Sequence, residues 1–179
     1  MNNFLCLLFI FFVAQNCCSH NHYENRRYSS DNENDLLIES KPNVIFILVD
    51  DLGWNDLGYS GSKFYETPNI DSLSKESFQF TNAYSASPVC SPTRAAIMTG
   101  KHPARLNITN YIPGYDPKNR SLIGPQNLNN LPLKEITIAE RLKEFGYKTF
   151  YVGKWHLGSD GYYPEDQGFD INVGGYEKG

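Results

Sequence analysis

The sequence has no basic stripe, no internal repeat and no low-complexity block. Its 179 residues include 16 Lys and Arg against 20 Asp and Glu, which gives a formal net charge of −4. This balance excludes the broad positive field of a nucleic-acid-binding protein, so no nucleic acid partner is expected. An anionic substrate therefore has to be bound by local cationic side chains rather than attracted by the overall charge of the chain. The 40% hydrophobic and 14% aromatic content predicts a globular chain, long enough for one domain with a sizeable core.

No apolar run is long enough for a stable membrane span, which takes about 20 residues. The run Phe4–Ala14 is short, stands at the extreme N-terminus and is followed closely by the small residues Cys17–Ser19. We interpret residues 1–19 as a secretory signal peptide. A membrane anchor and a bacterial lipoprotein modified at Cys17 are the alternatives. The predicted localisation is the secretory pathway, with a secreted, lysosomal or periplasmic destination.

Cysteine is scarce in the part of the chain that is expected to fold. Of the four cysteines, Cys6 lies in the signal peptide, and Cys17 and Cys18 lie at its predicted cleavage site. Cys90 is therefore the one cysteine left for the folded part. An unpaired cysteine in a secreted protein is expected to be oxidised, paired or chemically special.

Composition divides the rest of the chain. Residues 20–40 are polar and mixed in charge, which predicts a solvated leader or linker. Residues 41–179 are predicted to fold, and they contain glycosylation sequons at Asn107 and Asn119 that matter only in a eukaryotic host. Residues 101–133 are rich in Asn, Pro and Gly without a clear period, which is typical of a functional loop or of an insertion at the mouth of a site.

Strand and helix patterns alternate along the folded part. Asn43–Val49 is a continuous apolar run rich in β-branched residues, which predicts a strand buried on both faces. Pro68 suits the first position of a helix. Residues 137–146 combine a capping box, helical spacing and a final glycine, and Tyr147–Val152 predicts a second strand. We therefore expect an α/β fold with a mostly parallel sheet flanked by helices.

Cys90 begins the sequence Cys-Ser-Pro-Thr-Arg. Ser91 is expected to be the N-cap of a helix that has Pro92 in its first turn and ends at Gly100. Arg94 follows Cys90 by about one turn, so a reactive side chain, helix N–H groups and a guanidinium converge on one anion site. The alternatives are a buried structural cysteine and a low-pKa thiolate that attacks phosphate. The spacing from Cys90 to Arg94 is shorter than the spacing in thiolate phosphatases.

Two further clusters follow the predicted strands. Asp50 and Asp51 come directly after the first strand, and Lys154 and His156 follow the second. Ligands bind outside the carboxyl ends of parallel strands, so these clusters are expected to meet Cys90 in one crevice. Adjacent carboxylates suit a hard cation such as Ca²⁺ or Mg²⁺. Lysine can hold a tetrahedral anion, and histidine can move a proton near neutral pH. Taken singly, each cluster also fits a cap, a turn or an exposed loop.

The combined motifs resemble those of the sulfatase family, in particular its arylsulfatase-type members. The matching segments are residues 43–53, 67–71, 90–94, 146–158 and 164–170. They include the pattern Cys90-x-Pro92-x-Arg94, and the resemblance extends from residue 41 to about residue 175. It implies a fold like that of alkaline phosphatases and sulfatases, of which this chain would be a truncated form.

The resemblance also implies a sulfuric ester hydrolase that acts on a sulfated small molecule or glycan. Cys90 would be converted to formylglycine by a formylglycine-generating enzyme, and the hydrate of that aldehyde would be the nucleophile. Asp50, Asp51 and the modified Cys90 would bind one Ca²⁺. One hydrate oxygen would attack sulfur, the alcohol would leave, and loss of the second hydroxyl proton would expel sulfate and restore the aldehyde.

The cationic residues have roles in the same scheme. Arg94 would steady the hydrate, Lys154 would hold the sulfate, and His156 would contact the hydroxyl that is later deprotonated. Family members are considerably longer, so we expect residues 41–179 to be the N-terminal portion of a catalytic domain and the 179-residue chain alone to lack activity. The alternatives are a related phosphoester or phosphonate ester hydrolase with the same site, and a truncated, non-catalytic protein that binds metal or sulfated glycans.

Overall fold

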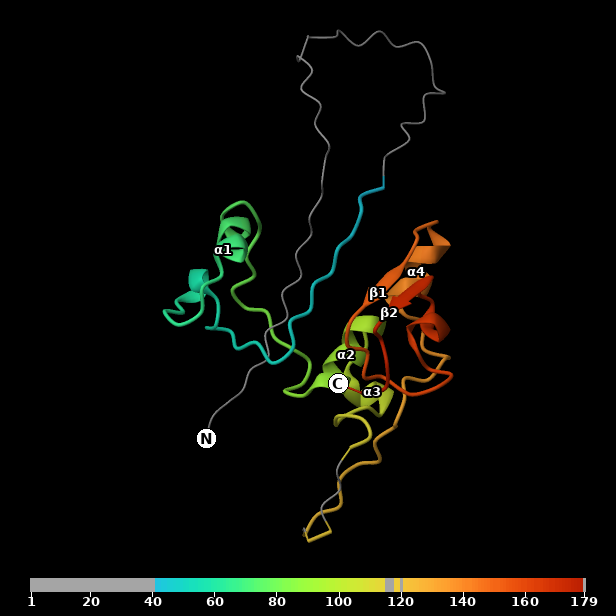
Figure 1. The fold of residues 1–179 in the computed structure, drawn as a ribbon. Coiled ribbons are helices and arrows are strands. Elements are labelled where there is room, and N and C mark those ends of the chain that lie inside the picture. Colours follow the sequence, from blue (N-terminus) through green and yellow to red (C-terminus); the bar gives the residue numbers. More distant parts are fainter. Residues whose placement is uncertain (1–40, 115–117, 120, 179) are drawn as a thin grey trace, which may run out of the picture.

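The computed structural model describes residues 41–114, 118–119 and 121–178 (Figure 1). The predicted signal peptide and linker lie outside the described residues. In chain order the elements are η1 (Gly58–Ser60), α1 (Pro68–Lys75), α2 (Cys90–Thr99), α3 (Pro103–Leu106), α4 (Ile138–Glu144), β1 (Phe150–Val152), η2 (Pro164–Gln167) and β2 (Ile171–Val173), where η marks a 3₁₀ helix. Figure 1 shows α2, α3, α4 and both strands gathered together, with α1 apart from them. None of the described helices has the length and apolarity of a membrane span.

The two strands form a parallel pair. Phe150 of β1 lies opposite Ile171 of β2, and Val152 lies opposite Val173. The connection between them carries η2, as a parallel pair needs a crossover rather than a tight hairpin. The strand predicted over Tyr147–Val152 is confirmed for its second half, and the parallel pairing beside helices agrees with the predicted α/β class.

The segment Asn43–Val49 is not a strand, so this prediction is wrong. It forms no ladder with another strand among the described residues. Ile45, Ile47 and Val49 are 41–57% exposed, while Phe46 on the opposite face is partly covered. A strand is held by hydrogen bonds to a partner, and the parallel ladder of β1 is made with β2. Phe46 and Leu48 of this segment line a cavity of about 520 Å³ together with the three residues of β1, so the two segments share a cavity without forming a ladder.

The predicted starts of α1 and α4 are confirmed, whereas the C-cap of α4 is Phe145 rather than the predicted Gly146. Pro68 is the first residue of α1. At the start of α4, the Thr137 hydroxyl accepts a hydrogen bond from the Glu140 N–H at 3.2 Å, and the Glu140 carboxylate accepts one from the Thr137 N–H at 2.7 Å. These two bonds complete the capping box. Gly146 follows the C-cap of α4 with a φ of 78°, a conformation that favours glycine.

Helix α2 begins before the predicted N-cap. Val89 is the N-cap and Cys90 the first helical residue, so the assignment of Ser91 as N-cap is wrong. The fully buried Ser91 hydroxyl instead accepts a hydrogen bond from the Ile112 N–H at 3.0 Å. This side chain therefore makes a long-range contact rather than a local one. Gly100 ends the helix with a φ of 67°, as predicted.

The hydrophobic core includes the segment that follows β1. Its buried members are Ala95, Met98, Leu106, Ile108, Ile112, Leu131, Trp155 and Leu157. The Leu131 N–H donates to the Leu157 carbonyl at 2.7 Å, so the irregular segment 101–133 contributes to the core as well as forming α3. Because Trp155 and Leu157 are fully buried, they hold the main chain on both sides of His156.

The Asp170 carboxylate links α4 to the residues before β1 and β2. Its contacts predict that the stability of the fold depends on pH. Its carboxylate lies 2.9 Å from the Lys143 Nζ and accepts from the Thr149 N–H at 2.9 Å. The lysine and then the threonine N–H lower the pKa of Asp170 to about 2, from an ordinary value of 3.8. The stabilisation is complete above about pH 4 and is lost as the pH falls toward 2, because the unfolded state binds this proton more readily than the folded state does.

We expect Asp170→Asn to lower the thermal midpoint at about pH 6 and to weaken its decline between about pH 5 and pH 2, as followed by circular dichroism. Asp160→Asn is the control, since Asp160 is exposed and forms no ion pair in the described part of the chain. An unchanged acid decline in Asp170→Asn contradicts this assignment.

Candidate active site

Asp50 is the meeting point of two cations. Its Oδ2 atom lies 2.5 Å from the Lys154 Nζ and 3.4 Å from the Arg94 Nη2. Partial burial alone would raise the pKa of Asp50, but Lys154 and Arg94 outweigh it and lower the pKa. The structure therefore brings together Asp50, which directly follows the segment 43–49, Arg94 of α2 and Lys154, which follows β1.

Cys90 joins this group through Lys154. The thiol is half-buried at the first position of α2 and is a free cysteine. The Lys154 ammonium interacts electrostatically with Cys90. Partial burial lowers the pKa of Lys154, but Asp50 and Cys90 outweigh burial and raise it, so the lysine is charged at neutral pH. An ammonium group beside the first turn of a helix can receive a tetrahedral anion at Cys90.

Arg94 is buried in spite of its charge. Its Nη1 donates to the Tyr151 hydroxyl at 3.3 Å and to the Lys154 carbonyl, and the Tyr151 hydroxyl donates to the same carbonyl. These bonds hold the guanidinium against the main chain that carries Lys154. The Arg94 Nε–H is buried without a partner among the described residues, so one donor is left for a further acceptor.

The His156 imidazole makes its hydrogen bond outside the group formed by Asp50, Arg94, Lys154 and Cys90. Its Nε2 lies 2.6 Å from the Ile112 carbonyl oxygen, and its Nδ1 is buried with no partner in the described part of the chain. No hydrogen bond joins the imidazole to Cys90 or Lys154 among the residues that the structure describes. The backbone of His156 has a φ of 57°, in the left-handed region. The structure thus places His156 near the site but leaves it outside the cluster around Asp50.

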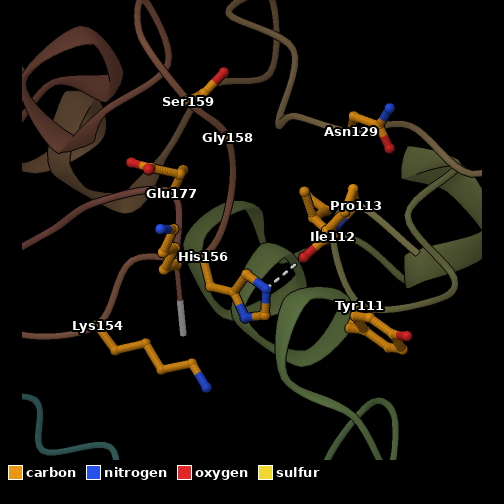
Figure 2. Close-up of a pocket in the computed structure, with 10 residues that line it drawn as sticks. Tyr111, Ile112, Pro113, Asn129, Lys154, His156, Gly158, Ser159 and Glu177 are labelled. Atoms are coloured by element: carbon orange, nitrogen blue, oxygen red, sulfur yellow. Dashed lines mark hydrogen bonds between the residues drawn. The ribbon is translucent and has the colours of Figure 1, made fainter. Parts of the chain in front are cut away.

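A cavity of about 680 Å³ lies beside Lys154 and His156 (Figure 2). The polar and aromatic side chains in its wall are Tyr111, Asn129, Lys154, His156, Ser159, Glu177 and Lys178. Its volume is in the range of small-molecule sites, roughly 300–1,000 Å³. Because Tyr111 and Asn129 belong to the segment 101–133, that segment contributes to the wall of a cavity next to the candidate active site.

Asp51 lies outside the cluster. It is exposed, and its carboxylate makes no hydrogen bond or ion pair within the described ranges. In those ranges, no three His, Cys, Asp or Glu side chains form a complete metal site. Both cations reach Asp50 through Oδ2, so its Oδ1 and both oxygens of Asp51 are available. Calcium takes about six to eight oxygen ligands, and these carboxylates fit part of such a set.

Two groups of the site are absent from the sequence predictions. Tyr151 lies in an apolar strand pattern, where nothing indicates that its hydroxyl meets Arg94. One weak signal exists, because alternate side chains of a strand point to opposite faces, which separates Tyr151 from Phe150 and Val152; the structure shows those two residues exposed and Tyr151 partly buried. The Ile112 carbonyl is a main-chain atom, and no side-chain pattern can indicate it.

Removal of the Tyr151 hydroxyl tests whether this hydroxyl stabilises the buried Arg94 guanidinium. In Tyr151→Phe, Arg94 loses an acceptor and the Lys154 carbonyl loses a donor, so we expect the free energy of unfolding to fall by about 1 kcal/mol. Burial raises the pKa of Tyr151, with Arg94 opposing it, so the hydroxyl keeps its proton at neutral pH. Urea denaturation measures the change. The control is Tyr163→Phe, because that hydroxyl bonds to Glu177 at the surface and should matter little. Equal effects in the two variants contradict this role of Tyr151.

Comparison with known proteins adds a family match. A sequence model described as Sulfatase matches residues 42–178. Arylsulfatase G of Rattus norvegicus is 37% identical over 135 residues, which cover 75% of this chain and 24% of that protein. N-acetylgalactosamine-6-sulfatase of Homo sapiens is 43% identical over 131 residues, which cover 72% of this chain and 24% of that protein. The chain spans about a quarter of the length of the curated relatives it matches.

Solved structures resemble the chain in three dimensions. The structure of Ps i-CgsB in complex with k-i-k-neocarrahexaose has a TM-score of 0.57 and 38% identity, and the match covers 70% of this chain and 27% of that chain. A structure solved in connection with the metabolism of multiple glycosaminoglycans by Bacteroides thetaiotaomicron has a TM-score of 0.53 and 36% identity. The match covers 69% of this chain and 26% of that chain. These matches confirm the α/β fold class predicted from the sequence.

Proposed function

The chain belongs to the sulfatase family, and we propose that its site hydrolyses a sulfate ester. The family match confirms the resemblance seen in the motifs. The observation that carries the proposal is the convergence of Lys154 and Arg94 on the Asp50 carboxylate, together with the electrostatic interaction of Lys154 with Cys90. Two local cations beside a reactive side chain are what an anionic substrate requires on a chain whose formal net charge is −4.

Cys90 is the proposed position of the nucleophile. A formylglycine-generating enzyme converts it to formylglycine, whose hydrate supplies a hydroxyl nucleophile. The Lys154 ammonium beside Cys90 holds the sulfate and offsets its charge. Arg94 steadies the hydrate, and its bonds to Tyr151 and to the Lys154 carbonyl keep it in place. His156 accepts the proton of the second hydroxyl, as a general base near neutral pH can.

One divalent cation, Ca²⁺, completes the proposal. Asp50, Asp51 and an oxygen of the modified Cys90 are the proposed ligands in this chain, and further ligands would have to come from elsewhere in the protein. The oxygen donors suit calcium rather than a softer metal. When bound, the cation stabilises negative charge on the transferring group as a Lewis acid.

The proposed substrate is a sulfated small molecule or glycan. The cavity beside Lys154 and His156 offers the Tyr111 ring, the Asn129 amide and the Ser159 hydroxyl to a polar ligand. One relative is named N-acetylgalactosamine-6-sulfatase, and one solved structure is a complex with k-i-k-neocarrahexaose. Both favour a sulfated glycan over other sulfate esters.

The proposed location is the secretory pathway, in a secreted, lysosomal or periplasmic form. Its basis is the predicted signal peptide over residues 1–19, which lies outside the described structure. Asn107 and Asn119 are exposed, so both predicted sequons are accessible to a glycosylating host. Glycosidase treatment followed by intact mass measurement tests these sites.

The proposal is tested on the native product, purified from its source. The mass of the Cys90 peptide is measured, together with the rates on p-nitrophenyl sulfate and p-nitrophenyl phosphate. An aldehyde at residue 90 with faster hydrolysis of the sulfate supports the proposal. Faster hydrolysis of the phosphate favours the related phosphoester hydrolase instead. An unmodified thiol without turnover overturns the enzymatic role and favours a non-catalytic binding protein.

A further inference from the structure

A chain of two hydrogen bonds connects α2 to the imidazole of His156. The Ile112 N–H donates to the Ser91 hydroxyl at 3.0 Å, and the Ile112 carbonyl bonds to the His156 Nε2 at 2.6 Å. All three residues are buried, with exposed fractions of 0% for Ser91, 7% for Ile112 and 9% for His156. One residue of the segment 101–133 therefore stands between the helix that carries Cys90 and the histidine.

The second of these bonds determines which nitrogen of His156 carries a proton. A carbonyl oxygen only accepts hydrogen bonds, so the His156 Nε2 has to donate to it. In the neutral imidazole, Nδ1 is then the bare nitrogen that can accept a proton. That nitrogen is buried and has no partner among the described residues. In Figure 2 it lies on the side of the ring toward the Lys154 ammonium, and both residues line the same cavity.

We propose that Ser91 is a positioning residue for His156, because its hydroxyl holds the Ile112 main chain and the Ile112 carbonyl holds the imidazole with Nδ1 as the proton acceptor. The inference rests on the proposed function, in which His156 takes a proton from the reacting hydroxyl. It goes further by assigning the atom that receives the proton and the residue that orients it. Ser91 adjoins Cys90 in α2, so the same helix places the nucleophile and orients the base.

A merely structural role of Ser91 is the alternative. A buried hydroxyl that satisfies a buried N–H stabilises a fold wherever it occurs. The two roles differ in the effect of removing the hydroxyl. A structural role predicts a general loss of folded protein, whereas a positioning role predicts a slower chemical step with substrate binding preserved.

The variant test is made on the full native protein, and each rate is normalised to the fraction of residue 90 that carries an aldehyde. We expect Ser91→Ala to lower kcat about 10- to 100-fold on p-nitrophenyl sulfate with KM changed less than about twofold, as misplacement of a catalytic group does. Ser91→Thr keeps the hydroxyl and should restore kcat to within about threefold of the unsubstituted protein. Thr137→Val is the matched control, since Thr137 is also fully buried and bonded through its hydroxyl but lies at the start of α4.

An unchanged kcat in Ser91→Ala overturns the proposal. An equal loss of kcat in Ser91→Ala and Thr137→Val also overturns it, because that result shows general destabilisation. If Ser91→Ala does not fold, the unsubstituted protein supplies the second test. Its histidines are labelled with ¹⁵N, and long-range proton–nitrogen correlations recorded over a range of pH show which ring nitrogen of the neutral imidazole carries the proton. The proposal requires a proton on Nε2 of His156, and a proton on Nδ1 overturns it.

Failure of the proposed function gives a different pattern. In that case the unsubstituted protein has no aldehyde at Cys90 and no turnover of the sulfate. The tautomer of His156 is still measured by the labelling experiment. A proton on Nε2 of His156 without turnover therefore contradicts only the proposed function. Turnover with the proton on Nδ1 contradicts only this inference.

Discussion

Replacement of Cys90 by serine should abolish multiple turnover of p-nitrophenyl sulfate and lower kcat/KM by roughly 10⁴- to 10⁶-fold, as loss of a covalent nucleophile does elsewhere. A serine hydroxyl beside Lys154 and Arg94 can still attack sulfur. The resulting sulfate ester has no second hydroxyl whose proton can be removed to expel sulfate. We therefore expect at most one turnover per molecule and a sulfate-bearing serine peptide in the mass spectrum.

Cys90→Ala is the matched control for this experiment. It removes the nucleophile without offering another one, so no sulfate-bearing peptide should form and turnover should be equally low. Continued turnover in Cys90→Ser contradicts the need for an aldehyde hydrate at this position. A sulfate-bearing peptide in Cys90→Ala shows that the group is transferred to another residue.

Replacement of Lys154 by alanine should lower kcat/KM by roughly 10²- to 10³-fold, the loss usual when one preorganised electrostatic partner is removed. Lys154 forms the ion pair with Asp50, interacts electrostatically with Cys90 and lines the cavity of Figure 2. Arg94 remains beside Asp50 in this variant, so one of the two cations persists. Steady-state rates on p-nitrophenyl sulfate measure the loss.

Two variants separate charge from position. Lys154→Arg keeps the positive charge, but its planar fork presents donors in a different geometry, so we expect recovery of only part of the rate. Lys101→Ala removes a lysine that pairs with Glu135 away from the site, and it should leave kcat/KM unchanged. A rate in Lys154→Ala close to that of Lys101→Ala is incompatible with a direct role of Lys154 in holding the sulfate.

The sequence by itself determined the features that depend on neighbouring residues. Pro68 begins α1, Thr137 caps α4 and Gly100 ends α2, because each of these depends on the backbone conformation of a few adjacent residues. The family was also recognisable from the sequence, since its motifs are short patterns such as that from Cys90 to Arg94. The matched region, residues 42–178, agrees with the extent of those motifs.

Only the tertiary structure decided which distant groups meet. A serine hydroxyl has the same chemistry as an N-cap and as a long-range acceptor, and Ser91 bonds to a residue 21 positions away. His156 bonds to a carbonyl 44 positions away, which no pattern around the histidine indicates. The apolar run Asn43–Val49 has the composition of a buried strand, but a strand also needs a partner at its edge. Long-range pairing depends on how segments pack, and that information is not contained in any single stretch of the chain.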